Sequence, residues 1–120
     1  MPAAARILVV DDNAVMLDAI SQMLRHKGFD VLSAASPRQA LQIVQDSRPI
    51  HLVVADFLMP EMQGTQLVRE VLRLSPQTAG VLMTGYVPVD VPDGVALLTK
   101  PFTSQELFRA IEAALAQSVK

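Results

Sequence analysis

The sequence predicts an α/β fold in which helices cover both faces of one five-stranded parallel sheet, a doubly wound arrangement. Five short apolar runs of strand length alternate along the chain with segments whose apolar residues recur at helical spacing. The strand-like runs are continuously apolar, which is typical of parallel strands buried on both faces. Alternation of the two kinds of segment is the pattern of strands joined by crossover helices.

Composition limits the possible functions. The chain has 120 residues, of which 51% are hydrophobic, so we expect residues 1–120 to form a single domain with a real core. A net charge of −2 does not favour direct binding of nucleic acid. The absence of cysteine excludes a disulfide scaffold and fits a reducing compartment. No apolar run could span a bilayer and no signal-peptide pattern opens the chain, so we expect a cytoplasmic protein without membrane insertion.

The first two strands are predicted at residues 6–10 and 30–34, with a helix between them. Asp12 or Asn13 would cap the start of this helix, because either side chain can accept hydrogen bonds from its first N–H groups. Gly28 would end it in the left-handed conformation. One face of the helix then presents Met16, Ile20, Met23, Leu24 and the stem of Lys27.

The remaining strands are predicted at residues 51–55, 79–83 and 96–99. The segment 36–39, Ser-Pro-Arg-Gln, is a capping box with proline at the first helical position, so a second helix begins there. It would bury Ala40, Leu41 and Val44. A third helix is predicted at 64–74, where four apolar residues form one stripe.

The stretch between Thr84 and Lys100 is too short for the regular alternation. Lys100 follows Thr84 by only sixteen positions, and Pro88 and Pro92 lie between them. A helix, two loops and a strand need roughly twenty residues or more, and proline disfavours a helix interior. We therefore expect the fourth helix to be shortened or absent. A second capping box at 103–106 opens the last helix.

Charged side chains follow three of the predicted strands. Asp11 and Asp12 come after the first strand, Asp56 after the third and Lys100 after the fifth. The carboxyl ends of parallel strands meet at one edge of the sheet, where such folds bind ligands. Three carboxylates and one ammonium in a single crevice are costly unless a cation lies among the carboxylates and an anion meets the lysine. The cluster therefore predicts a divalent metal and a phosphoryl group.

Four short motifs occupy the ends of predicted strands in chain order. They are Asp11-Asp12, Asp56-Phe57-Leu58-Met59-Pro60 with Gly64, Thr84-Gly85, and Lys100-Pro101-Phe102. With these motifs, residues 6 to about 117 resemble a receiver domain of two-component phosphorelay signalling, of the type found in hybrid histidine kinases and single-domain response regulators. The resemblance implies a flavodoxin-like strand order 2-1-3-4-5.

The resemblance also implies a role for each acid. Asp56 would be the phosphoacceptor, whose carboxylate attacks phosphorus and forms an acyl phosphate. Asp12, Asp56 and the backbone carbonyl of Leu58 would bind Mg²⁺ directly, and Asp11 would act through a bound water. Oxygen ligands suit Mg²⁺, which usually keeps several waters.

Lys100 would supply a compact cation to a phosphoryl oxygen, and the Thr84 hydroxyl would donate to another. Gly85 would leave room beside the phosphorus. The peptide bond between Lys100 and Pro101 would be cis. The resemblance further implies that the phosphoryl group comes from a phosphohistidine of a histidine kinase or histidine phosphotransfer protein, and leaves to water or to another histidine.

The chain departs from the family pattern in two places. Leu97 occupies a position, three residues before Lys100, that often holds an aromatic switch residue, and a leucine cannot act as one. Leu58 and Tyr86 occupy the two positions that flank the phosphoryl site, and neither carries an acid or amide to orient water. We therefore expect a relatively long-lived acyl phosphate.

Other functions remain alternatives. A Mg²⁺-dependent aspartyl phosphohydrolase commonly carries a second acid two residues after its nucleophile, where this chain has Leu58. A phosphorylation-independent interaction module would be expected to have lost an acid or the lysine. A dinucleotide-binding domain needs a Gly-x-Gly-x-x-Gly turn, where this chain has Asp-Asp-Asn. We expect a module that takes part in its own phosphotransfer and dephosphorylation, rather than an enzyme of the usual turnover kind.

Overall fold

The computed structural model describes residues 4–47, 49–85 and 91–118 of the chain. These residues form five strands and four helices, which alternate except between the last two strands. In chain order the elements are β1 (Arg6–Val10), α1 (Ala14–Lys27), β2 (Asp30–Ala34), α2 (Pro37–Asp46), β3 (Leu52–Asp56), α3 (Gly64–Leu74), β4 (Ala79–Thr84), β5 (Val95–Thr99) and α4 (Ser104–Ser118). Within these ranges, no helix combines the length and the apolar character needed to cross a membrane.

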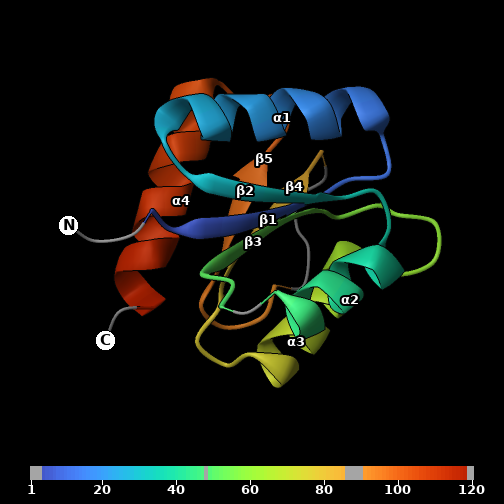
Figure 1. Ribbon diagram of the computed structural model, residues 1–120. Helices are drawn as coiled ribbons and strands as arrows, with labels where there is room; N and C mark the ends of the chain where they lie inside the picture. Colours follow the sequence, from blue (N-terminus) through green and yellow to red (C-terminus); the bar gives the residue numbers. More distant parts are fainter. Residues whose placement is uncertain (1–3, 48, 86–90, 119–120) are drawn as a thin grey trace.

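The five strands form one parallel sheet in the order β2-β1-β3-β4-β5, which confirms the predicted order. β1 lies between β2 and β3, with Ile7 beside Val31 on one side and beside Leu52 on the other. Figure 1 shows α1 and α4 on one face of the sheet and α2 and α3 on the other. All five strands therefore end at the same edge, as the prediction of a shared crevice requires.

Successive side chains of a strand enter two different cores, one on each face of the sheet. On β1, Ile7 and Val9 belong to the core shared with α1 and α4, whereas Leu8 and Val10 belong to the core shared with α2 and α3. Every residue of the central strand β3 is buried. Burial on both faces explains why the strands are continuously apolar in sequence.

The N-cap of α1 is Asn13, one of the two residues that the sequence left open. Its side-chain oxygen accepts hydrogen bonds from the N–H groups of Val15 at 3.0 Å and Met16 at 3.1 Å. Gly28 ends the helix with φ of 108°, in the left-handed region that favours glycine. Because Asn13 caps the helix, the carboxylate of Asp12 is left for the crevice.

The two predicted capping boxes form to different extents. At α4, Thr103 and Glu106 each accept from the other's backbone N–H, at 3.1 and 2.9 Å, so this capping box is complete. At α2, the Ser36 hydroxyl accepts from the Gln39 N–H at 3.1 Å. The Gln39 amide, however, accepts from the N–H of Ala35 rather than from that of Ser36. Both helices still begin where the sequence predicts.

The connection from β4 to β5 has no helix in the part that the structure describes. Gly85 forms a bend, and residues 91–94 form an irregular segment and a turn in which Gly94 has φ of 82°. Residues 86–90, with Pro88 among them, lie outside the described residues. The expectation of a shortened or absent fourth helix is confirmed, and the helix labelled α4 is the last one in the chain.

Candidate functional site

Asp56 is held by its backbone at the carboxyl edge of the sheet. It is the last residue of β3. The strand ends one position beyond the predicted range 51–55, because the pairing with β4 continues to Asp56, which lies opposite Met83. The N–H of Phe57 then donates to the Met83 carbonyl at 2.8 Å, and the N–H of Gly64 donates to the Phe57 carbonyl at 2.8 Å. The residue as a whole is 9% exposed, so its carboxylate has little freedom.

Asp11 follows β1 directly and is 1% exposed. Its N–H donates to the Ala34 carbonyl of β2 at 3.2 Å, and its Oδ1 accepts from the N–H of Asn13 at 2.9 Å. The other carboxylate oxygen, Oδ2, is buried without a hydrogen-bond partner among the described residues. A buried carboxylate oxygen without a donor is costly, and a cation would relieve that cost.

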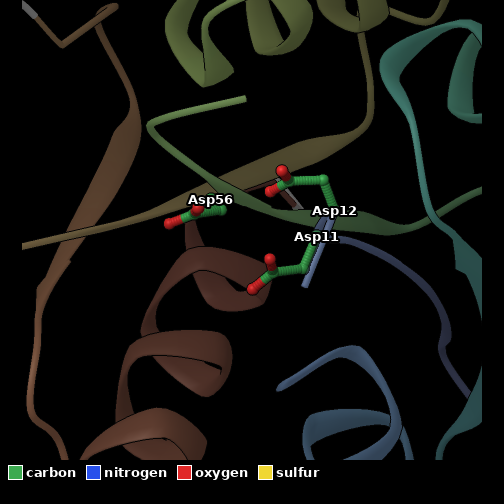
Figure 2. A group of neighbouring side chains, drawn as sticks. All are labelled: Asp11, Asp12 and Asp56. Carbon is green, nitrogen blue, oxygen red and sulfur yellow. The ribbon is translucent and has the colours of Figure 1, made fainter. Parts of the chain in front are cut away.

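The three predicted acids come together. Figure 2 shows the side chains of Asp11, Asp12 and Asp56 gathered at the ends of β1 and β3. Each offers one carboxylate oxygen, and these oxygens all lie within 4.8 Å of one another. Asp12 is exposed, whereas the other two acids are buried. Carboxylate oxygens at this spacing fit a hard divalent cation.

The electrostatics of the cluster are most evident at Asp11. Burial raises the pKa of the Asp11 carboxyl, the hydrogen bond from the Asn13 N–H lowers it, and the neighbouring carboxylate of Asp56 raises it further. Lys100 lowers the pKa of Asp11 by a smaller amount, so the net direction is upward. Ionisation of Asp11 is therefore less favourable in the folded protein than in an exposed aspartate.

Lys100 is paired with Asp56. Its Nζ donates to Asp56 Oδ1 at 2.7 Å, and both side chains are largely buried. The N–H of Lys100 donates to the Thr84 carbonyl at 2.7 Å, so the lysine continues the pairing of β5 with β4. The peptide bond between Lys100 and Pro101 is cis, as the resemblance implies.

The remaining predicted residues lie near the ends of β3 and β4. Thr84 is the last residue of β4 and is buried. At Gly85, a Cβ atom would meet nothing within 4 Å, which agrees with the open space predicted there. Leu58 is 50% exposed, and the role of its carbonyl as a metal ligand stays a prediction. Tyr86 lies outside the described residues.

Two partners of the site were not foreseen from the sequence. The N–H of Asn13 orients Asp11, and an aspartate two residues before the donor is the signal of an Asx turn that could have indicated it. Gly64 packs against the backbone of Asp56. The only sequence signal for that contact was the place of Gly64 in the motif after the third strand.

A parallel doubly wound domain that places one buried aspartate beside two further acids and a lysine, at the carboxyl edge of its sheet, has the fold and the site of the receiver class. A family model for the response regulator receiver domain matches residues 7–112 of this chain. The chain belongs to that family, and it is a receiver domain of the response regulators of two-component signalling.

Sequence and structure comparisons agree with this assignment. The chain is 32% identical over 122 residues to the transcriptional regulatory protein GlrR of Escherichia coli (strain K12), an alignment that covers 95% of the chain and 27% of GlrR. It thus spans about a quarter of that curated relative. The CheY-like receiver domain protein from Methanospirillum hungatei JF-1 superposes with a TM-score of 0.86 at 27% identity, covering 97% of both chains. The receiver domain of the hybrid histidine kinase CckA superposes with a TM-score of 0.81 at 28% identity, covering 92% of this chain and 99% of the other.

Proposed function

We propose that this receiver domain accepts a phosphoryl group on the carboxylate of Asp56, in a Mg²⁺-dependent transfer from a phosphohistidine of a histidine kinase or histidine phosphotransfer protein. The observation that carries the proposal is the position of Asp56 between opposite charges. Its Oδ1 accepts from Lys100 Nζ at 2.7 Å, while its carboxylate shares a space with Asp11 and Asp12. This arrangement offers both a cation site and an anion site at one nucleophile.

Asp12, Asp56 and the backbone carbonyl of Leu58 would hold the Mg²⁺ ion directly, and Asp11 would hold it through a water. In support, Asn13 takes over the capping of α1, so the oxygens of Asp12 are not committed to the helix. Asp11 Oδ1 accepts from a backbone N–H, but its Oδ2 has no partner among the described residues and can accept from a metal-bound water. When bound, Mg²⁺ offsets the repulsion between an anionic phosphoryl donor and the three carboxylates.

In the transfer, a carboxylate oxygen of Asp56 attacks phosphorus in line with the imidazole nitrogen of the donor. The new O–P bond forms as the N–P bond breaks, and the electron pair of that bond stays on the imidazole nitrogen. Lys100 moves from Asp56 Oδ1 to a phosphoryl oxygen, and the Thr84 hydroxyl contacts another. The resulting acyl phosphate is lost to water or to a histidine of a second protein.

The surface beside Lys100 suits a protein as phosphodonor. A cavity of about 550 Å³ opens between α1 and the segment after β5, with a mostly apolar lining. Its lining consists of Met16, Ala19, Ile20, Met23, Lys100, Pro101 and Phe102. Among the described residues, the large hydrophobic side chains that are most exposed are Val15 at 78% and Leu58 at 50%, on segments that adjoin Asp12 and Asp56. Apolar surface at a charged site favours docking of a protein over capture of a small anion alone.

The alternatives are not favoured. An aspartyl phosphohydrolase would use a second acid at the position of Leu58, which is half-exposed and apolar. An interaction module without phosphorylation does not need Asp11, Asp12, Asp56 and Lys100 to come together, and here they do. We further propose that residues 1–120 act as one receiver domain in the cytoplasm, the reducing compartment that a cysteine-free chain fits.

The test is incubation with acetyl phosphate, with Mg²⁺ or with EDTA, followed by intact-mass measurement. We expect the gain of one phosphoryl group per chain with Mg²⁺ and almost none with EDTA. A parallel assay with p-nitrophenyl phosphate should show no sustained release of nitrophenol. A chain that gains no phosphoryl group with Mg²⁺, or that turns over the ester repeatedly, would contradict the proposal.

A further inference from the structure

The first residue of α3, Gly64, lies in direct contact with the backbone of Asp56. A Cβ atom built on Gly64 would lie 2.2 Å from the carbonyl oxygen of Asp56, and 2.9 Å from its carbonyl carbon. It would also lie 2.9 Å from Cδ2 of Leu82 on β4. Real Cβ atoms essentially never approach other atoms to less than 3.0 Å, so any side chain at position 64 forces a movement.

The backbone of Asp56 has no room to make that movement on its other side. Asp56 pairs with Met83 of β4, and the next N–H along the chain, from Phe57, donates to the Met83 carbonyl at 2.8 Å. The N–H of Gly64 donates to the Phe57 carbonyl at 2.8 Å. The peptide group between Asp56 and Phe57 is therefore held between β4 and the start of α3.

Space, and not backbone conformation, explains the glycine. Among the glycines that the structure describes, only Gly28 and Gly94 have positive φ, so an alanine at position 64 could adopt the backbone angles of Gly64. Alanine is also the better helix former, so helix propensity alone would favour it in the first turn of α3. The cost of a side chain at position 64 therefore arises at the carbonyl of Asp56.

We propose that Gly64 is a positioning residue for phosphotransfer. The lack of a side chain lets α3 pack onto the Asp56 peptide, and this packing keeps the Asp56 carboxylate within reach of Lys100, Asp11 and Asp12. The inference rests on the proposed function of Asp56 as phosphoacceptor. A side chain at position 64 displaces Asp56 by a distance on the order of 1 Å, and displacements of that size lower rates by about 100-fold.

Gly80 in β4 provides a matched control. A Cβ atom there would lie 3.0 Å from Val68 Cγ1 on α3 and 3.2 Å from Val95 Cγ2 on β5. The substitution Gly80→Ala thus crowds the same helix against the same sheet. The atoms it meets belong to side chains rather than to the backbone, and Gly80 pairs with Val53, three positions before Asp56.

The experiment compares wild type, Gly64→Ala and Gly80→Ala in acetyl phosphate with increasing Mg²⁺. The phosphorylation rate is read by intact mass and corrected for the folded fraction from thermal melts. For Gly64→Ala we expect a limiting rate lower by about 10-fold to 100-fold. We also expect a higher Mg²⁺ concentration at half of the limiting rate, because the Asp56 carboxylate is proposed both to bind Mg²⁺ and to attack phosphorus. For Gly80→Ala we expect both quantities to stay within about 2-fold of wild type.

A double variant separates positioning from packing. Gly64→Ala/Leu82→Val removes the side-chain atom that the new Cβ meets and leaves its contact with the Asp56 carbonyl. Because the contact with the Asp56 carbonyl remains, a positioning role predicts that the double variant does not regain rate. The inference is overturned if rate returns together with stability, if Gly64→Ala matches Gly80→Ala, or if both Gly64 variants are unfolded. Failure of wild type itself to accept phosphoryl would instead contradict the function of Asp56, and would remove the inference with it.

Discussion

Lys100 Nζ donates to Asp56 Oδ1 at 2.7 Å, so the proposed phosphoacceptor is paired with the lysine that we expect to bind the phosphoryl group. The pair is partly buried, with 31% of the Lys100 side chain and 12% of the Asp56 side chain exposed. Lys100 is thus the cation that faces the acidic cluster before any metal binds. We expect this pairing to stabilise the fold, and we expect Lys100 to leave Asp56 Oδ1 when a phosphoryl group arrives.

Lys100→Met should lower the free energy of unfolding in EDTA by about 1.5–3 kcal/mol, the range for a hydrogen bond to a charged group. Methionine keeps most of the length of the side chain, so the loss reports the ammonium group. Urea unfolding with EDTA and with Mg²⁺ would measure it. The deficit should be smaller with Mg²⁺, because the ion supplies part of the missing positive charge. A variant as stable as wild type in EDTA would show that Lys100 does not offset the cluster.

Asp11→Asn should raise the melting temperature in EDTA at pH 7.5 by a few degrees, since about 1 kcal/mol corresponds to roughly 4 °C for a domain of this size. Burial and the carboxylate of Asp56 raise the pKa of Asp11, so its ionised form opposes folding. The variant keeps an oxygen that can accept from the Asn13 N–H. Asp18→Asn, at an exposed position of α1, is the control and should change the melting temperature little.

The pH dependence of that effect has a definite sign. A carboxyl whose pKa is raised in the native state binds its proton more tightly when folded, so wild type gains stability as pH falls through the native pKa toward the ordinary aspartate pKa of 3.8. The advantage of Asp11→Asn should therefore be largest at pH 7.5 and smaller at pH 5. Thermal melts in EDTA at both values would show it. An advantage that grows toward pH 5, or a variant less stable at pH 7.5, would contradict the charge-cluster account.

Leu58→Asn should speed hydrolysis of the acyl phosphate several-fold. Leu58 is half-exposed two residues after Asp56 and carries no group that can orient the attacking water, whereas an amide can hydrogen-bond to it. Decay of the mass-shifted species after removal of acetyl phosphate gives the rate. Leu58→Ala separates the effect of the amide from the effect of side-chain size, because alanine is smaller than leucine and supplies no amide. An unchanged or slower decay of Leu58→Asn would rule out this explanation of a long lifetime.

Thr65→Val should raise the free energy of unfolding by about 1 kcal/mol. The Thr65 hydroxyl is buried in the first turn of α3 and has no hydrogen-bond partner among the described residues. Thr78 provides the opposite case, because its hydroxyl donates to the Ile50 carbonyl at 2.7 Å and lies 2.8 Å from Ser75 Oγ. Thr78→Val should lower the same quantity by about 1–3 kcal/mol, since it leaves a buried acceptor unpaired. Equal effects of the two substitutions in urea unfolding would contradict this assignment.

The fold could be predicted well from the sequence because strands that are buried on both faces are continuously apolar. The apolar runs located all five strands to within one residue at either end, since each strand is covered on both faces. The count between Thr84 and Lys100 predicted a shortened or absent fourth helix, and the described part of this connection contains none. The cap of α1 could not be decided in advance, because Asp12 and Asn13 are both good caps and only the folded backbone brings Asn13 to Val15 and Met16.

The charged residues of the site were also predictable, because each follows a strand and all strands end at one edge. The contacts that orient them were not. The Asn13 N–H that holds Asp11, and the close approach of Gly64 to the Asp56 carbonyl, depend on distances between backbone groups. Residue type carries little information about such distances. The pairing of Lys100 with Asp56 likewise depends on which anion is present, and a sequence does not specify that.

The central claim is that Asp56 is the single phosphoacceptor, and substitution of this residue tests it most directly. Wild type, Asp56→Asn and Asp11→Asn are incubated with acetyl phosphate and Mg²⁺, and the intact mass is followed over time. Wild type should gain one phosphoryl group. Asp11→Asn should also gain a single phosphoryl group, but at a lower rate, since it keeps the nucleophile and loses one acid of the proposed metal site. Asp56→Asn should gain none. An Asp56→Asn protein that gains the same mass at the rate of wild type would contradict the account.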